Sequence, residues 1–317
     1  MDLDIRGKVA IIGGSSKGLG RACALALAKE GVNIVLCARQ EEALQKTKSE
    51  IESLGVEVLA LSVDMASGKD NQRIIGETIR KFGRIDILIN NSGGPKPGTF
   101  RDVTSDDLDD AYRSVLKYNI RMIQGCLPFM EKNGWGRIVN ITSVTVKEPA
   151  PNMVLSNIFR SAVVSFAKTI SKEVISSGIT INNVSPGYFK TDRVMQLMKV
   201  RSEAEGISTN EYEQKAILDF PHKRYMDPQE LGNLVCYLCS EQAKSINGTT
   251  IQVDGGMLVE IFFPRNCFPT LGRFSCQFQD FYHYFVVGQS RQVVRLRVNF
   301  SSNYTGKIRK SIVPLCV

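Results

Sequence analysis

A glycine-rich turn near the N-terminus has the residue types and spacing of a pyrophosphate site. Segment 14–20 arranges three glycines as Gly-xxx-Gly-x-Gly, between an apolar run at Val9–Ile12 and a stretch of helical periodicity from Leu19 to Glu30. A strand, a tight turn and a helix in this order expose backbone N–H groups and the positive end of the helix, and both favour a phosphate. We therefore expect this turn to bind a dinucleotide.

The end of the second apolar run indicates which dinucleotide would bind. Ile34–Cys37 is followed by Ala38 and Arg39, without the acidic residue that contacts the ribose 2′-hydroxyl in enzymes that use NAD. Arg39 can pair with a 2′-phosphate instead, and Lys17 in the glycine turn can approach the same phosphate. Each cation alone could be an ordinary surface charge, but together they favour NADP (NADPH) over NAD.

The elements that must position this turn form a regular alternation along the chain. Seven apolar runs are predicted as strands: Val9–Ile12, Ile34–Cys37, Val56–Leu61, Ile85–Ile89, Ile138–Ile141, Ile179–Val184 and Thr250–Val253. Amphipathic stretches of helical length separate them, for example Gln40–Leu54 and Asn71–Phe82. Such alternation, with strands that are apolar on both faces, predicts an α/β fold with a Rossmann-type, doubly wound, mostly parallel sheet and helices on both faces.

The positive charge is concentrated in the last 60 residues. The chain carries +8, but segment 258–317 holds eight Lys and Arg against two acidic residues, so only about +2 belongs to the rest. Residues 1–257 therefore lack the excess of positive charge that is typical of nucleic-acid-binding proteins. The tail is rich in aromatic residues, and its only period-two alternation, from Val293, predicts one exposed strand.

The role of the tail stays open at this point. It could be an added segment, an extension that binds a partner, or a segment foreign to the fold. Nucleic-acid binding through its cations and stacked aromatic rings is the competing function outside enzymes.

Composition gives no sign of a membrane, secreted or metal-binding protein. No apolar run approaches the ~18 residues of a membrane span, and the acidic start Met1–Asp4 lacks an apolar signal core. The eight cysteines are scattered, and the close pair Cys236 and Cys239 lies in an apolar helical stretch. We expect buried thiols, no metal site and a cytoplasmic location.

Several motifs in order make residues 4–257 resemble the short-chain dehydrogenase/reductase family, close to its 3-oxoacyl-acyl-carrier-protein reductase branch. They are the turn Gly14–Gly20, Asp64, Asn90-Asn91-Ser92-Gly93, Asn119, the strand 137–143 that ends at Ser143, Asn182 with Pro186-Gly187 and Thr191, and Val253-Asp254-Gly255-Gly256. The resemblance predicts a single NAD(P)-binding reductase domain over residues 1–257, with the tail 258–317 outside it.

The resemblance also implies a cofactor site and an oligomer. The cofactor would contact Gly14, Ser16, Lys17, Gly18, Leu19, Gly20, Arg39, Asp64, Met65, Asn91, Ser92, Gly93, Arg160, Pro186, Gly187 and Thr191. The family sheet usually has seven strands. Its members are often tetramers or dimers, joined through two long helices that would span about 105–132 and 152–177 here.

The catalytic positions of the family show a departure. Ser143 and Asn119 match the family serine and asparagine, but Ser156 replaces the tyrosine and Arg160 replaces the lysine four residues later. A serine hydroxyl is a far weaker acid than a phenol of pKa ~10, and an arginine stays protonated and releases no proton. Loss of a general acid typically costs about 10²–10⁴ in rate. We keep Ser143, Asn119, Ser156 and Arg160 as the catalytic candidates.

Three functions remain compatible with this departure. The favoured one is an NADP(H)-dependent oxidoreductase that reduces a ketone or 3-oxoacyl-type carbonyl to an alcohol, or the reverse, with a proton from Tyr188, Tyr118 or a water held by Ser143 and Ser156. The second is an NADP-binding sensor or scaffold without reductase activity. The third is an enzyme whose substrate needs no enzymic acid. The expected partner is a small carbonyl or alcohol, received under a lid over residues 192–227.

Overall fold

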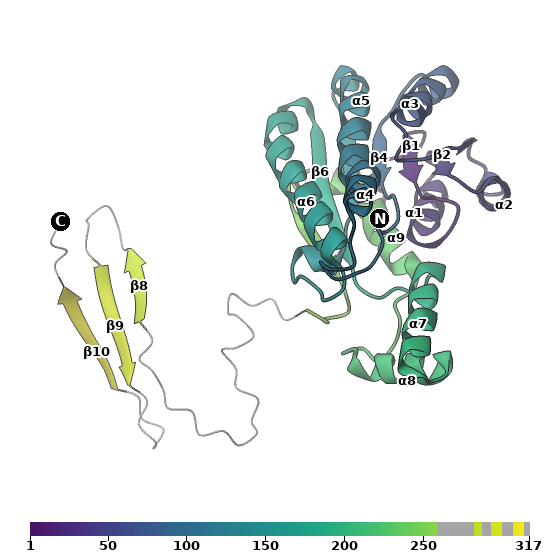
Figure 1. The fold of residues 1–317 in the computed structure, drawn as a ribbon. Coiled ribbons are helices and arrows are strands. Elements are labelled where there is room, and N and C mark those ends of the chain that lie inside the picture. The colour runs from purple at the N-terminus through teal and green to yellow at the C-terminus, as the bar shows by residue number, and fades with distance from the viewer. Residues whose placement is uncertain (259–281, 287–292, 300–306, 314–317) are drawn as a thin grey trace. The chain divides into compact units, whose positions relative to one another are not determined.

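Seven parallel strands form one sheet in the order β3-β2-β1-β4-β5-β6-β7 (Figure 1). They are β1 Val9–Gly13, β2 Asn33–Ala38, β3 Val58–Ser62, β4 Ile87–Asn90, β5 Gly136–Ile141, β6 Ile179–Pro186 and β7 Thr250–Val253. In this computed structural model the structure describes residues 1–258, 282–286, 293–299 and 307–313. The predicted Rossmann-type α/β fold and its seven strands are confirmed, and the sheet is wholly parallel.

Helices cover both faces of the sheet because successive strand residues point to opposite sides. Ala10 and Ile12 of β1 belong to a buried cluster shared with α1 (Gly18–Lys29), α2 (Glu41–Glu52) and α9 (Pro228–Leu238). Val9 and Ile11 belong to a second cluster on the other face, shared with the following helices: α3 (Gly68–Phe82), α5 (Tyr118–Asn133) and α6 (Val154–Val174). The apolar runs of the sequence are therefore buried on both sides.

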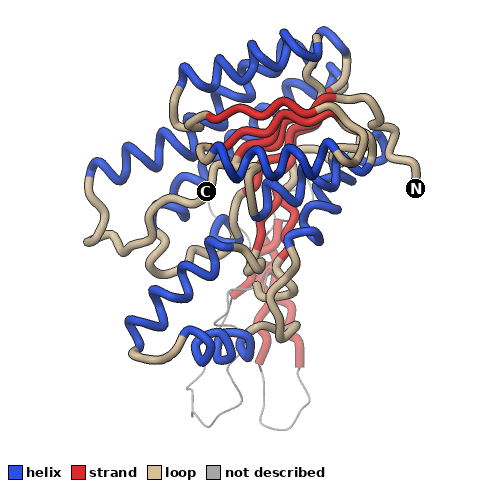
Figure 2. The backbone as a smooth tube through the Cα atoms, turned by 90° about the vertical axis from the view of Figure 1, so that its right-hand side faces the viewer, coloured by secondary structure: helices blue, strands red, loops and turns tan. Residues whose placement is uncertain are grey.

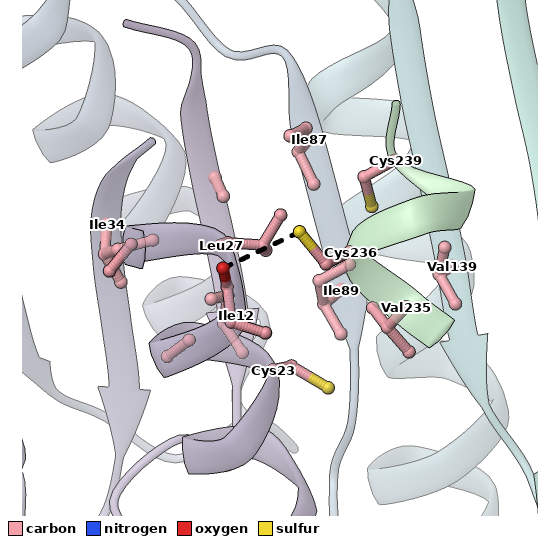
Figure 3. Close-up of a cluster of buried hydrophobic side chains, with 14 of the residues drawn as sticks. Ile12, Cys23, Leu27, Ile34, Ile87, Ile89, Val139, Val235, Cys236 and Cys239 are labelled. Carbon is pink, nitrogen blue, oxygen red and sulfur yellow. Dashed lines mark hydrogen bonds between the residues drawn. The ribbon is translucent and has the colours of Figure 1, made fainter. Parts of the chain in front are cut away.

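The close cysteine pair lies in the first of these clusters (Figure 3). Cys236 and Cys239 are free thiols among apolar side chains, and the Cys236 Sγ donates to the Ala26 carbonyl oxygen at 3.6 Å. Burial raises the pKa of the Cys236 thiol to about 12. The expectation of buried thiols is confirmed for both residues.

The first long helix expected at 105–132 is interrupted. α4 (Ser105–Ala111) begins with a capping box between Thr104 and Asp107, and a π-helical turn, η1 (Tyr112–Lys117), joins it to α5. The extra residue of a π turn shifts the side chains that follow, and such turns are frequent at functional sites. The second long helix corresponds to α6 and the short 3₁₀ turn η3 (Ile175–Ser177).

Two helices between β6 and α9 stand apart from those that cover the sheet (Figures 1 and 2). They are α7 (Asp192–Glu205) and α8 (Thr209–Asp219), and both lie within the lid expected over residues 192–227. A small apolar cluster of their own, centred on Met198, Phe220 and Tyr225, holds them together. The lid also contacts the rest of the molecule, since Met226 belongs to the cluster that α1 and α9 share.

The chain divides into two compact units, Met1–Val259 and Glu260–Val317. In the second unit, β8 (Tyr282–Val286), β9 (Val293–Asn299) and β10 (Lys307–Val313) form an antiparallel sheet in the order β10-β9-β8. The sequence predicted one strand in this segment, but the structure has three. β9 corresponds to the predicted strand, and β8 and β10 pair with it on either side. Along the described part of the chain, no helix has both the length and the apolar character of a membrane span.

Candidate active site

The glycine turn between β1 and α1 has the shape expected for a phosphate cradle. Gly14 and Gly18 adopt positive φ angles of 54° and 58°, which side chains rarely tolerate. A Cβ on Gly20 would collide with the Gly14 carbonyl oxygen. α1 has neither a capping side chain at Lys17 nor an acidic residue in its first turn, so its first N–H groups remain available to an anion.

Neighbouring strands hold this turn in place. Asn91, just after β4, donates from Nδ2 to the Gly13 carbonyl oxygen at 3.1 Å. The Cys37 N–H at the end of β2 donates to the buried Ser15 hydroxyl at 2.9 Å. The turn is thus fixed to the strands on either side of β1. The strand order reverses between β1 and β4, which is the place where doubly wound sheets bind ligands.

Two exposed cations lie near the turn in the chain and could pair with a 2′-phosphate, Lys17 within it and Arg39 after the neighbouring strand β2. Arg39 is exposed directly after β2, and that strand ends without an acidic residue. The Lys17 Nζ lies 3.2 Å from an Asp192 carboxylate oxygen at the start of α7, and both side chains are more than half exposed. An exposed pair of this kind is weak, so the Lys17 ammonium can exchange it for a phosphate. The residues of this crevice therefore fit NADP(H).

The other predicted cofactor residues line the same edge of the sheet. Asp64 and Met65 follow β3, where the Asp64 carboxylate accepts from the Ala66 N–H at 3.0 Å and Met65 is buried. Thr191 caps α7 by accepting from the Val194 N–H at 3.4 Å. The remaining residues lie in the glycine turn, in the first turn of α1, or at and just after strand ends: Ser16, Leu19, Ser92, Gly93, Pro186 and Gly187.

Hydroxyl groups at the catalytic positions are joined through a residue that the sequence did not indicate. The Ser143 Oγ accepts from the Thr145 N–H at 3.2 Å, and the Thr145 and Ser156 hydroxyl oxygens lie 3.2 Å apart. Thr145 and Ser156 are both buried, whereas Ser143 is partly exposed. Ser156 therefore stands behind Thr145, and Ser143 is the hydroxyl of this group that a substrate can reach.

Arg160 is held by three main-chain carbonyl groups. Its Nη1 donates to the Ile141 and Thr142 carbonyl oxygens, each at 2.8 Å, and its Nη2 donates to the Gly93 carbonyl oxygen at 2.6 Å. The guanidinium thus ties the end of β5 to the loop after β4. Burial, and then the positive charge of Arg193, lower the pKa of Arg160 to about 10, so the group stays positive at neutral pH.

Asn119 lies in the first turn of α5, two residues after the π-helical segment η1. Its Nδ2 donates to the Val115 carbonyl oxygen within that segment at 2.6 Å. Its buried Oδ1 has no hydrogen-bond partner in the structure. A buried acceptor without a partner is costly, so this oxygen is available to a water or a ligand group.

The two tyrosines considered as proton donors differ in access. Tyr118 is fully buried beneath Gly13, and burial raises its pKa well above the ordinary value, so it cannot reach a substrate in this conformation. Tyr188 lies between β6 and the lid, is partly exposed, and stacks on Phe220 of the lid with ring centroids 5.1 Å apart. Burial alone would lower the pKa of Arg201, but the hydroxyl groups of Tyr188 and Tyr212 beside it raise that pKa.

Four features of the site had no signal in the sequence. Thr145 belongs to no motif, the π turn looks like ordinary helix, and the partner of Lys17 lies far along the chain. Arg193 was also missed; its Nη2 donates to the Pro95 carbonyl oxygen at 3.1 Å in the loop that also receives Arg160. Only the packing of α7 against this loop reveals that contact.

Comparisons with known proteins agree with this geometry. Residues 14–258 match the family described as Enoyl-(Acyl carrier protein) reductase. A 3-oxoacyl-acyl-carrier-protein reductase of Staphylococcus epidermidis is 31% identical over 251 residues, covering 79% of this chain and 98% of the relative. The NADPH-dependent reductase BacG of Bacillus subtilis is 30% identical over 256 residues, covering 80% and 99%.

A solved structure extends the likeness to three dimensions. L-sorbose reductase from Gluconobacter frateurii, in complex with NADPH and L-sorbose, superposes with a TM-score of 0.79 at 33% identity. The match covers 82% of this chain and all of that one. The family match ends at residue 258, so it leaves out the last 59 residues, in which the antiparallel sheet lies.

Proposed function

The chain belongs to the short-chain dehydrogenase/reductase family, and we propose that it is an NADP(H)-dependent oxidoreductase that interconverts a ketone or 3-oxoacyl-type carbonyl and an alcohol. The observation that carries the proposal is that Arg160 donates to the Thr142 carbonyl oxygen, beside Ser143, at the same edge of the sheet as the glycine turn. Lys17 in that turn and the exposed Arg39 are the proposed partners of a 2′-phosphate. The relatives described as NADPH-dependent, or solved with NADPH, support the choice of cofactor.

Each residue of the site has a defined task in this proposal. NADPH supplies the hydride when bound. The Ser143 hydroxyl donates a hydrogen bond to the substrate carbonyl oxygen. Arg160, which is positive at neutral pH and is held in place by its three carbonyl contacts, stabilises the negative charge that develops on that oxygen. Thr145 fixes the orientation of Ser143, and Ser156 in turn supports Thr145.

The proton must come from a group other than Ser156 acting alone, because an aliphatic hydroxyl is too weak an acid. We propose a water near Ser143, with the unpartnered Asn119 oxygen as its anchor, or the Tyr188 phenol beside Arg201. Exchange of Tyr188 for Phe separates the two sources, since only the second loses its donor.

A second candidate function is an NADP-binding sensor or scaffold without reductase activity. The observation that favours it is that Arg160 and Ser156 make their hydrogen bonds to the protein itself. The same crevice would then bind the cofactor, but no carbonyl compound would oxidise it.

We also propose the setting in which the protein works. Residues 1–257 form the reductase domain, and 258–317 form a separate part of unknown role. The long helices around α5 and α6 join copies into a dimer or tetramer in the cytoplasm. Sedimentation of the full chain and of a chain ending at Met257 tests the assembly and the domain boundary together.

Titration with NADPH and NADH, followed by nicotinamide fluorescence, tests the proposed function. A panel of ketones and 3-oxoacyl thioesters is then added to the protein–NADPH complex. Oxidation of NADPH by at least one compound supports the oxidoreductase. Tight binding without oxidation across the panel favours the sensor, and binding of neither nucleotide contradicts both.

A further inference from the structure

Two guanidinium groups meet at the loop that follows β4. Arg160 of α6 donates to the Gly93 carbonyl oxygen at 2.6 Å, and Arg193 from the first turn of α7 donates to the Pro95 carbonyl oxygen at 3.1 Å. A Cβ built on Gly94, between these two positions, would lie 3.5 Å from Arg193 Nη2. Two positive side chains from distant parts of the chain are thus held on the same three-residue segment.

Within residues 1–258, no ion pair neutralises these two charges. None of the ion pairs among residues 1–258 uses Arg160 or Arg193, and the nearest acidic neighbour in sequence, Asp192, pairs with Lys17. Burial lowers the pKa of Arg160 most, and the positive charge of Arg193 lowers it further because it repels the charged guanidinium. Like charges held close together favour the binding of an anion between them.

The arginine pair lies beside the proposed catalytic serine. Arg160 also donates to the Thr142 carbonyl oxygen, one residue before Ser143. The contacts of the two arginines lie at the carboxyl edge of the sheet, where ligands bind in such folds. This edge includes the loop after β4, the end of β5 and the start of α7, which follows β6. Arg193 is exposed, so a ligand can reach it from solvent.

We propose that Arg160 and Arg193 form a subsite for an anionic group of the substrate, so that the enzyme prefers oxo acids or oxo phosphates to neutral ketones. The inference rests on the oxidoreductase function proposed above. Arg160 uses three of its five N–H donors on carbonyl groups, and the remaining donors and those of Arg193 suit carboxylate or phosphate oxygens.

Matched pairs of carbonyl compounds test the subsite. They are 2-oxopentanoate and 4-oxopentanoate with their methyl esters, and dihydroxyacetone phosphate with dihydroxyacetone. Binding to the protein–NADP⁺ complex, which has no hydride to give to a carbonyl, is measured by calorimetry, and kcat/KM is measured by NADPH oxidation. We expect at least one anion to exceed its neutral partner by about tenfold or more in affinity, as charge-assisted hydrogen bonds imply. The carboxylate and phosphate pairs show which anion is preferred.

Variants of α7 distinguish binding of an anion at the arginine pair from a general electrostatic attraction of anions to the protein surface. Arg193→Gln is expected to lower affinity for the preferred anion by about 10- to 100-fold and to leave its neutral partner within about twofold. Arg193→Lys keeps the charge and should retain most of the preference. The matched control Lys199→Gln removes an exposed charge from the same helix, α7, and should retain all of it.

Several outcomes would overturn the subsite. They are the absence of an anion preference in every pair, a preference that survives Arg193→Gln, and a weakening of NADPH itself as large as that of the anion. A failure of the proposed oxidoreductase looks different. In that case no compound, charged or neutral, oxidises NADPH, while calorimetry still reports on the arginine pair.

Discussion

The hydroxyl oxygens of Ser156 and Thr145 lie 3.2 Å apart in the protein interior, and Ser156 is only 2% exposed. Thr145 in turn donates its N–H to the Ser143 Oγ at 3.2 Å. Ser156, which we propose stands where the family has its proton donor, is thus connected to the proposed catalytic Ser143 through one intervening residue. In this chain we assign Ser156 the task of positioning, and the proton has another source.

The positioning task predicts a modest loss in Ser156→Ala. The buried Thr145 hydroxyl would lose its partner, which costs about 1–3 kcal/mol in the free energy of unfolding. We expect kcat to fall less than tenfold, whereas Ser143→Ala, which removes the hydroxyl that meets the substrate, should lower kcat about 100-fold or more. Urea unfolding and steady-state kinetics measure the two effects. Equal losses of kcat in the two variants would assign Ser156 to the chemistry itself.

The pKa of Arg160 predicts where kcat/KM for carbonyl reduction falls on the alkaline side of its pH profile. Burial and the neighbouring Arg193 lower this pKa to about 10, so Arg160 stays positive below that value and loses its proton as the pH rises through it. Titration of Arg160 should therefore leave kcat/KM almost unchanged between about pH 6 and 9 and should lower it toward pH 10. Arg160→Gln should be slow at every pH and lack this decline. An unchanged decline in Arg160→Gln would assign it to another group.

Cofactor choice is predicted to depend on Arg39. Arg39→Asp replaces a partner of the 2′-phosphate by a repelling carboxylate, so the Kd for NADPH should rise about 100-fold while that for NADH changes less than about threefold. The exposed Arg101→Asp, with the same change of charge, is the matched control. Nicotinamide fluorescence gives both constants. Parallel losses for NADPH and NADH would argue against the assignment of Arg39.

Two glycine substitutions are expected to act in opposite directions. Gly20→Ala places a Cβ against the Gly14 carbonyl oxygen and should abolish measurable NADPH binding and destabilise the fold. Gly76→Ala, on the exposed side of α3 with open space around it, should stabilise the protein by about 0.5–1 kcal/mol because alanine is the better helix former. Thermal unfolding and NADPH titration test both. Normal NADPH affinity in Gly20→Ala would contradict the proposed cradle.

The fold was predictable because its signals are local and agree with one another. Ala10 and Ile12 face one buried layer while Val9 and Ile11 face the other, so each strand appears as a continuous apolar run. The π turn at Tyr112–Lys117 was not predictable, since one extra residue hardly changes helical periodicity. The tail showed one alternating strand, and its pairing with two others has no short-range signal.

The site was predictable only where a motif carried it. The glycine turn, Asn91 and Ser143 follow the family pattern, and the fold brings their elements to one edge of the sheet. Thr145 and Arg193 match no pattern. Their contacts join segments far apart in the chain or depend on the path of a loop, as in the bond from Arg193 to Pro95.

The transfer of hydride from NADPH to a carbonyl carbon is the central claim, and isotope labelling tests it most directly. The protein is incubated with NADPH deuterated at C4 of the nicotinamide and with the carbonyl panel, and the alcohols are analysed by mass spectrometry. We predict one deuterium per alcohol molecule from one of the two C4 positions, with a rate that falls about 100-fold or more in Ser143→Ala. Tight NADPH binding without deuterium in any alcohol would contradict the claim and leave a protein that binds the cofactor without reducing a carbonyl.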